Sequence, residues 1–151
     1  AAHLLAHGLD PEEVSRHVYY SESEGRVRLV GEVIDTLVVE RECGLAWVTV
    51  PDGALERFGL RPDDLEGVVD YPRSVVGVRA ALMFRSLANG RIKVSFRSTG
   101  DIDVGKLAEN FGGGGHKNAA GASFEGKLAD VQRITLTAMR DLLAPRESAT
   151  S

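Results

Sequence analysis

Residues 78–98, VRAALMFRSLANGRIKVSFRS, decide the fold of this chain. Two apolar-rich runs flank an Asn-Gly pair at residues 89–90, which is the strongest short-range signal for a β-hairpin because both residue types tolerate positive φ. Apolar and polar residues alternate in the second run, with Ile92, Val94 and Phe96 set against Lys93, Ser95 and Arg97. Since residues two apart share one face of a strand, this strand is predicted to have a core face and a polar face.

Strands and helices interleave on both sides of this hairpin. A second hairpin is predicted around Cys43-Gly44, between β-rich runs at residues 37–42 and 45–50, and an edge strand at residues 122–126. Helices are predicted over residues 1–37, with starts at Asp10 and at Ser21 or Ser23, and over residues 51–58, 62–71, 103–111 and 127–144. We therefore expect an α/β or α+β fold, in which helices flank a mixed β-sheet with two hairpins.

The composition narrows the class of protein. The chain has 151 residues, of which 43% are hydrophobic and 26% are charged, and its net charge is −4. These values are typical of one globular domain and disfavour non-specific nucleic-acid binding through a broad basic surface. No apolar run reaches the roughly 18–20 residues of a membrane span. One cysteine, Cys43, permits no internal disulfide, so a cytoplasmic protein with no membrane partner is expected.

The segment FGGGGHKNAAGASF, residues 111–124, raises the question of function. Four consecutive glycines are costly to order, so they indicate either a flexible linker or a backbone that another group approaches closely. The linker is disfavoured, because Ser, Pro and polar residues do not surround the run. The segment also lacks the Gly-Lys-Ser/Thr of a P-loop and the G-x-G-x-x-G of a dinucleotide fold.

The same segment nevertheless has the features of an anion site. Backbone N–H groups of Gly112–Gly115 can face one anion, and His116 adds a donor. Residues 116–120 are predicted to start a short helix directly after the glycine loop, and a helix N-terminus favours anions. The sequence therefore predicts a phosphate or carboxylate site, with phosphate favoured because the donors converge.

The segment GGGGHKNAAGA, residues 112–122, resembles the Gly-Gly-Gly-His motif in the C-terminal DHH-associated domain of DHH-family phosphoesterases. The longer segment 93–126, KVSFRSTGDIDVGKLAENFGGGGHKNAAGASFEG, is similar to that family's order of an Arg-Ser strand, a short helix and the glycine loop. The likeness extends from about residue 10 to residue 143. It is greatest to the two-domain branch that includes nanoRNases, 3′-phosphoadenosine-5′-phosphate phosphatases and phosphodiesterases of cyclic or linear dinucleotides.

The resemblance implies three parts and a missing domain. Residues 1–37 would be a helical linker from an N-terminal catalytic domain, residues 38–144 the substrate-binding domain, and residues 145–151 a disordered tail. In the family, a separate N-terminal domain with an Asp-His-His motif holds two metals, usually manganese. Nothing in this sequence resembles that motif, and the start AAHLLAH has no initiator Met, so a fragment that is inactive alone is expected.

The resemblance also implies roles for individual residues. His116 would be the catalytic residue that, with the glycines, holds the substrate phosphate, and Arg97 would bind a second phosphate or the 5′ end. The implied substrate-binding set is Arg97, Ser98, Gly112, Gly113, Gly114, Gly115, Lys117, Asn118 and Ala119. The implied substrates are short oligonucleotides, dinucleotides or nucleoside 3′,5′-bisphosphates.

Two other functions stay open. The domain could bind nucleic acid in its own right, or belong to a longer RecJ-type single-strand exonuclease; it could also be a structural or dimerising domain.

Several residues have simpler explanations: Asp103 as a helix cap, Asp101 as a turn residue, Asp63 and Asp64 at a helix start, and Trp47 in the core. Weaker functional candidates are His3 and His7 as metal ligands, Cys43 as a nucleophile, Arg85, and the tyrosines Tyr19, Tyr20 and Tyr71.

Overall fold

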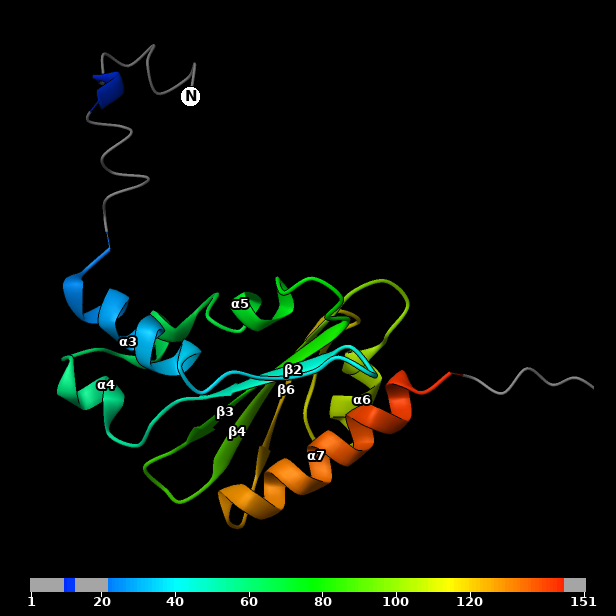
Figure 1. The fold of residues 1–151 in the computed structure, drawn as a ribbon. Helices are drawn as coiled ribbons and strands as arrows, with labels where there is room; N and C mark the ends of the chain where they lie inside the picture. The colour runs from blue at the N-terminus through cyan, green and yellow to red at the C-terminus, as the bar shows by residue number, and fades with distance from the viewer. Residues whose placement is uncertain (1–9, 13–21, 146–151) are drawn as a thin grey trace, which may run out of the picture.

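The computed structural model describes residues 10–12 and 22–145, and their centre is one open six-stranded sheet (Figure 1). The strand order is β1-β2-β3-β4-β6-β5. The β2–β3 pair is parallel and the other four pairs are antiparallel, so the predicted mixed sheet is confirmed. The strands are β1 Val38–Glu40, β2 Leu45–Thr49, β3 Ala80–Ser86, β4 Ile92–Ser98, β5 Gly114–His116 and β6 Ala119–Phe124.

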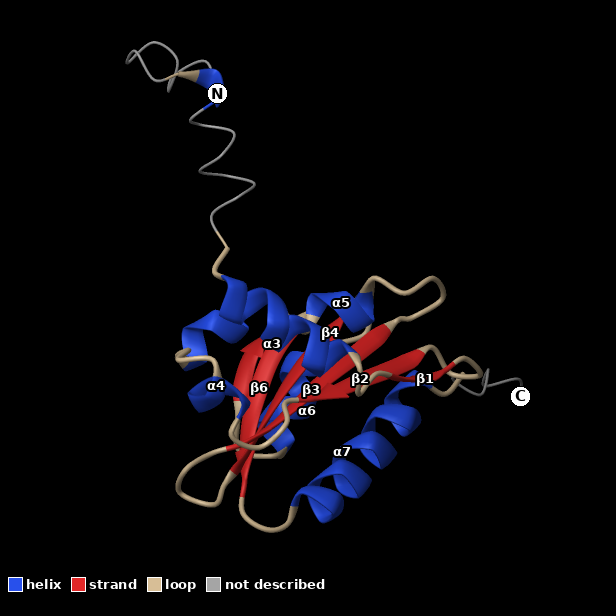
Figure 2. Ribbon diagram, turned by 60° about the vertical axis from the view of Figure 1, so that its left-hand side comes forward, coloured by secondary structure: helices blue, strands red, loops and turns tan. Residues whose placement is uncertain are grey.

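Helices cover both faces of the sheet (Figure 2). They are α3 Glu24–Ile34, α4 Ala54–Arg57, the 3-10 helix η1 Pro62–Leu65, α5 Asp70–Arg73, α6 Val104–Asn110 and α7 Leu128–Leu143. One apolar cluster joins α6 and α7 to inward side chains of β2, β3, β4 and β6. A second cluster, on the other face, joins α3 and α4 to β2 and β3. None of the residues in this second cluster belongs to β4, β5 or β6, and on this face the η1–α5 segment lies beside β4.

The β3–β4 hairpin is confirmed, and its turn uses one left-handed residue. The N–H of Gly90 donates to the carbonyl of Leu87 at 3.0 Å, and the N–H of Leu87 donates to the carbonyl of Arg91 at 2.7 Å. Gly90 has φ +79°, whereas no described non-glycine residue has positive φ. The connection is therefore a type I turn followed by a left-handed glycine, and Asn89 does not need positive φ.

The two hairpin strands differ in burial because of their places in the sheet. β3 lies between both apolar clusters, so residues 80–84 are all buried. The two faces of β4 differ: its apolar residues are buried in the first cluster, whereas Lys93 is exposed and Ser95 and Arg97 are half-buried beside the η1–α5 segment. The predicted alternation on this strand is confirmed.

The first helical segment is confirmed in part. Ser23 is the N-cap of α3, and its Oγ accepts the N–H of Arg26 at 3.1 Å, while Oδ1 of Asp10 accepts the N–H of Glu12 at 3.1 Å. α3 ends at Ile34, and its Leu29 and Val33 are fully buried. The remaining predictions for residues 1–9 and 13–21, including those for His3, His7, Tyr19 and Tyr20, and the tail beyond residue 145 lie outside the described residues.

Two predicted helices are wrong in detail. The predicted helix at residues 62–71 is split into η1 and α5, because Gly67 adopts φ +81° and a left-handed residue ends a helix. The short helix predicted after the glycine loop is a third hairpin, in which residues 117 and 118 connect β5 to β6. β6 must be extended there, because it pairs with β4 along residues 119–124.

Candidate phosphate-binding site

The three strands β4, β6 and β5 place Arg97, Ala119 and His116 in one row. Arg97 is opposite Ala119, and Ala119 is opposite His116. Directly opposite residues of antiparallel neighbours project from the same face, so the side chains of Arg97 and His116 share a face with only a methyl group between them. At about 4.8 Å between neighbouring strands, their Cα atoms are about 10 Å apart.

This row lies on the face of the sheet opposite the first apolar cluster, and its Arg97 end lies beside the η1–α5 segment. We call this part of the sheet surface the open face. Its residues are Lys93, Ser95 and Arg97 on β4, Ala119, Gly121 and Ser123 on β6, and Gly114 and His116 on β5. His116 is exposed, and Arg97 and Ala119 are half-buried. Small residues at positions 119, 121 and 114 leave the backbone accessible, so an external group can approach it closely.

The fold itself requires three of the four glycines of the loop. Gly112 has φ +81° at the end of α6. A Cβ at Gly113 would lie 2.1 Å from the carbonyl oxygen of Gly121, and one at Gly115 would lie 2.5 Å from the Cα of Ala120. Any side chain at Gly113 or Gly115 would collide with backbone, so both glycines are needed for β5 to pack against β6.

Gly114 is different, because nothing in the fold requires a glycine there. Its φ is not in the left-handed region, and an added Cβ would meet no atom within 4 Å. It is two residues before His116 on the same strand and therefore shares the open face with it. A glycine that the fold does not need, beside a histidine that has no partner in the described part of the chain, indicates close approach of a group from outside the chain.

Two of the glycine N–H groups that the sequence offered to an anion are used within the fold. The N–H groups of Gly112 and Gly113 donate to the carbonyls of Glu109 and Ala108 at 3.0 and 2.8 Å, where they end α6. β5 is an edge strand, and the backbone groups on the outer side of an edge strand have no further strand to pair with. Donors for an anion would therefore come from β5 and His116, and not from a helix N-terminus.

Ser98 and Asn118 hold the β5–β6 turn in place. Ser98 is 2% exposed, and its Oγ donates to the carbonyl of Ile102 at 2.6 Å. The amide of Asn118 donates to Oγ of Ser98 at 3.0 Å and to the carbonyl of Gly100 at 3.2 Å. The Ser98 N–H in turn donates to the Asn118 carbonyl at 3.0 Å. This network is directed into the fold, away from the open face; substrate contacts by these two residues stay predictions.

The neighbouring charged residues also have structural partners. Nζ of Lys117 pairs with Oδ1 of Asp101 at 3.2 Å. The backbone carbonyl of Lys117 accepts the N–H of Val104 at 2.8 Å. Asp103 caps α6 by accepting the N–H of Lys106 at 3.0 Å, as predicted. Asp64 accepts the N–H of Arg61 at 2.8 Å at the start of η1, which confirms its predicted role.

Arg97 and His116, by contrast, keep most of their donors free. The guanidinium of Arg97 donates to the neighbouring carbonyl of Phe96 at 2.9 Å and pairs with no carboxylate in the described part of the chain. Within the same residues, the imidazole of His116 makes no hydrogen bond and no ion pair. Both side chains are available to a ligand on the open face.

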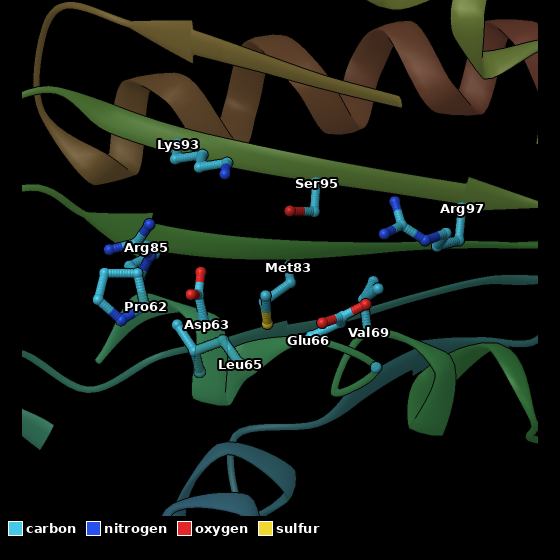
Figure 3. Close-up of a pocket in the computed structure, with 11 residues that line it drawn as sticks. Pro62, Asp63, Leu65, Glu66, Val69, Met83, Arg85, Lys93, Ser95 and Arg97 are labelled. Atoms are coloured by element: carbon cyan, nitrogen blue, oxygen red, sulfur yellow. The ribbon is translucent and has the colours of Figure 1, made fainter. Parts of the chain in front are cut away.

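A pocket of about 250 Å³ adjoins the open face at Arg97 (Figure 3). Its strand side is formed by Met83, Arg85, Lys93, Ser95 and Arg97, and its other side by residues of the η1–α5 segment, including Asp63 and Glu66. The sequence placed Lys93 and Arg97 on one face of β4 but could not show that Arg85 lies beside them. Lys93 was not among the predicted site residues.

Other candidates from the sequence do not join this site. Trp47 and Cys43 are half-buried against the first apolar cluster, with Sγ of Cys43 close to Glu40, and Tyr71 is exposed. Over residues 10–12 and 22–145, no three His, Cys, Asp or Glu side chains are grouped closely enough to hold a metal ion. None of the helices described there has the length and apolar character needed to cross a bilayer.

Comparison with known proteins agrees with this geometry. Residues 45–143, which span β2 to α7 and contain the whole open face, match the DHHA1 domain. The chain belongs to the DHHA1 domain family. The predicted resemblance to the DHH-associated domain of DHH-family phosphoesterases is thereby confirmed.

Two curated relatives of this DHHA1 domain carry the same description, "Bifunctional oligoribonuclease and PAP phosphatase NrnA". The protein from Thermus thermophilus is 32% identical over 146 residues, which cover 95% of this chain and 42% of the relative. The protein from Bacillus subtilis is 29% identical over 123 residues, which cover 82% of this chain and 38% of the relative. The chain therefore spans about two fifths of the length of these relatives.

Solved structures share the fold of the DHHA1 domain. An exopolyphosphatase-related protein from Bacteroides fragilis superimposes with a TM-score of 0.80 at 32% identity, covering 94% of this chain and 43% of that one. The pGpG-specific phosphodiesterase PggH from a Vibrio species superimposes with a TM-score of 0.53 at 12% identity, covering 88% of this chain and 43% of that one, which shows a common fold.

Proposed function

We propose that this DHHA1 domain is the substrate-binding half of a phosphoesterase that acts on short oligonucleotides, dinucleotides or nucleoside 3′,5′-bisphosphates. The main support for the proposal is that Gly114, on the open face, is a glycine that the fold does not require. It lies two residues before His116, whose imidazole has no partner within the described residues. A phosphate needs such a surface, because its oxygens accept hydrogen bonds at short range from backbone and side-chain donors.

In this proposal Gly114, His116 and Arg97 each have one task. The bare backbone at Gly114 lets the phosphate approach β5, and the imidazole of His116 donates to a non-bridging oxygen and stabilises charge as it develops there. Arg97, about 10 Å away across two strand spacings, binds a second phosphate or the 5′ end through two parallel N–H groups of its guanidinium. Ser98 and Asn118 keep the β5–β6 turn rigid and so position His116.

The metal chemistry is assigned to a partner domain. The described residues contain no group of three metal-ligating side chains, so they do not fit a manganese site. We propose an N-terminal catalytic domain in cis, which agrees with relatives more than twice as long as this chain. The open face, none of whose residues belongs to either apolar cluster, is the surface that such a domain would face. A cytoplasmic location is proposed with it.

Titration of the 15N-labelled chain with adenosine 5′-monophosphate tests the binding site. We expect the largest amide shifts at Gly114, His116 and Arg97, and a Kd raised at least tenfold by His116→Ala. Lys127→Ala, which removes an exposed side chain before α7 on the opposite face, is the matched control and leaves the Kd unchanged. Shifts centred elsewhere, or an unchanged Kd in His116→Ala, would contradict the proposal and favour a structural or dimerising domain.

A stand-alone nucleic-acid module is distinguished by salt and length. Such a module binds long single strands more tightly than short ones, with a steep fall in affinity as salt rises, because many phosphates are neutralised together. The net charge of −4 favours the short ligand.

The reading frame upstream of Ala1 tests the cis arrangement: an Asp-His-His domain there supports the proposal, and a different domain contradicts it.

A further inference from the structure

The pocket beside Arg97 brings two more cations to the same side of the sheet. Arg85 of β3 is directly opposite Lys93 of β4, so the two side chains are cross-strand neighbours on one face. Lys93 is four residues from Arg97 on β4, which corresponds to about 13 Å along the strand. Figure 3 shows Arg85 and Lys93 at one end of the pocket and Arg97 at the other.

This arrangement is electrostatically unfavourable for the protein alone. Like charges directly opposite each other destabilise a sheet. Burial lowers the pKa of the Arg85 guanidinium, an effect that the charge of Glu56 opposes, but an arginine stays charged at neutral pH. Within the described residues, neither Arg85 nor Lys93 forms a hydrogen bond or a salt bridge with its side chain.

Most of the other described arginines have a carboxylate partner. Seven of those described form ion pairs with carboxylates: Arg26, Arg28, Arg57, Arg73, Arg91, Arg133 and Arg140. Asp63 and Glu66 line the pocket opposite the cations, yet neither forms a salt bridge with them. Two adjacent cations that face a pocket and form no salt bridge within the described residues are suited to an anionic group of a ligand.

The position of the pocket indicates which ligand. Ser95 and Arg97 belong both to the pocket and to the open face, so the two are continuous along β4. A chain of nucleotides whose first phosphate lies at His116 and whose second lies at Arg97 would continue toward Lys93. Met83, Leu65 and Val69 supply apolar surface between the charged ends for a sugar or base. Asp63 and Glu66 repel phosphates, which keeps the backbone of the ligand on the strand side.

We propose that Arg85 and Lys93 form a further phosphate-binding position, occupied when the ligand is a single-stranded oligonucleotide that extends past the nucleotide held between His116 and Arg97. This inference rests on the proposed function and names its substrate class: oligonucleotides occupy the open face and the pocket, whereas a nucleoside monophosphate or bisphosphate occupies only the part between His116 and Arg97.

The test compares two probes on the Arg85→Gln/Lys93→Gln variant. The probes are adenosine 5′-monophosphate and a 5′-phosphorylated tetra-adenylate, titrated at several salt concentrations. We expect the Kd of the tetranucleotide to rise at least fivefold and its salt slope to fall by about 0.7 for each phosphate that the variant no longer neutralises. The Kd of the monophosphate changes less than twofold. The control Lys127→Gln/Arg133→Gln removes the same charge from the opposite face and affects neither probe.

Failure of this inference is distinguishable from failure of the proposed function. The inference alone is overturned if His116→Ala still weakens the binding of both probes but Arg85→Gln/Lys93→Gln leaves the Kd of the tetranucleotide unchanged or raises the Kd of both probes equally. If His116→Ala weakens the binding of neither probe, the proposed function itself fails. Thermal unfolding of each variant confirms that it is folded, as expected for side chains at the rim of a pocket.

Discussion

Arg97 and His116 lie in one row across the sheet, although 18 residues separate them in the sequence, and Ala119 is the single residue between them in the row. Their spacing is set by backbone pairing of three strands and not by the conformation of a loop. Groups held on strands are positioned more accurately than groups on loops, which suits a site that recognises two phosphates at a set distance.

The two middle glycines of the loop are expected to respond in opposite ways to alanine. Gly113→Ala places a methyl group 2.1 Å from the Gly121 carbonyl, so it should lower the free energy of unfolding by about 3 kcal/mol or more. Gly114→Ala meets no atom, so stability should stay within about 0.5 kcal/mol of the wild type or rise slightly. Urea unfolding of both variants measures the difference.

Ligand binding should depend on Gly114 even though stability does not. Gly114→Ala is expected to raise the Kd for adenosine 5′-monophosphate about tenfold while the protein stays fully folded, because the methyl group occupies the space that the phosphate needs. A stable Gly114→Ala variant with wild-type affinity would show that no ligand approaches β5 at this point.

The buried contact between Ser98 and Asn118 is expected to contribute stability to the β5–β6 turn. Ser98→Ala removes a hydroxyl that donates to Ile102 and accepts from Asn118, which should cost about 1–3 kcal/mol of unfolding free energy because two hydrogen bonds of a buried side chain are lost. Thermal unfolding measures the decrease. Thr99→Ala, which removes an exposed hydroxyl at the next position, is the control and should cost less than about 0.5 kcal/mol.

Lys93→Glu should separate stability from binding. The substitution replaces a like-charge cross-strand pair by an opposite-charge pair with Arg85, so the unfolding free energy should rise by about 0.2–1 kcal/mol. The same variant should bind the tetranucleotide more weakly. A fall in stability would show that Lys93 has a favourable structural role, and the repulsion argument would then be incorrect.

The ion pair between Glu40 and Arg140 predicts a stability change in acid. Two bonds of 2.8 Å join Nε and Nη2 of Arg140 to the carboxylate, and they hold the pKa of Glu40 below its usual value of 4.5 despite partial burial. A carboxyl with a lowered folded pKa stabilises the protein above about pH 4.5, and this contribution disappears as pH falls through the folded pKa.

The comparison with Glu40→Gln measures this contribution. At pH 7 the wild type should be more stable by about 0.5–1 kcal/mol, a modest value because both side chains are partly exposed to solvent. The difference should shrink as pH falls below 4.5, since a protonated glutamate resembles glutamine. A difference that is constant from about pH 7 to about pH 3 would mean that packing, and not the charge pair, joins β1 to α7.

Local features were predictable because their causes lie within a few residues. The β3–β4 hairpin follows from alternation and a turn signal, and the caps at Ser23 and Asp103 follow from short side chains that bond to nearby N–H groups. The helix predicted after the glycine loop failed for the opposite reason. Residues 119–124 form a strand because β4, more than 20 residues earlier, pairs with them, and nothing local signals that pairing.

The sequence by itself determined that the chain carries a glycine-rich loop with His116, an Arg-Ser strand before it, and an α/β pattern of the DHHA1 type. Only the tertiary structure decided what each residue faces. It turned Ser98 inward, left Gly114 as the one glycine of the four that the fold does not need, and set Arg85 beside Lys93. The physical reason is strand pairing: register between distant segments assigns side chains to a face, and a shift of one residue would reverse every assignment.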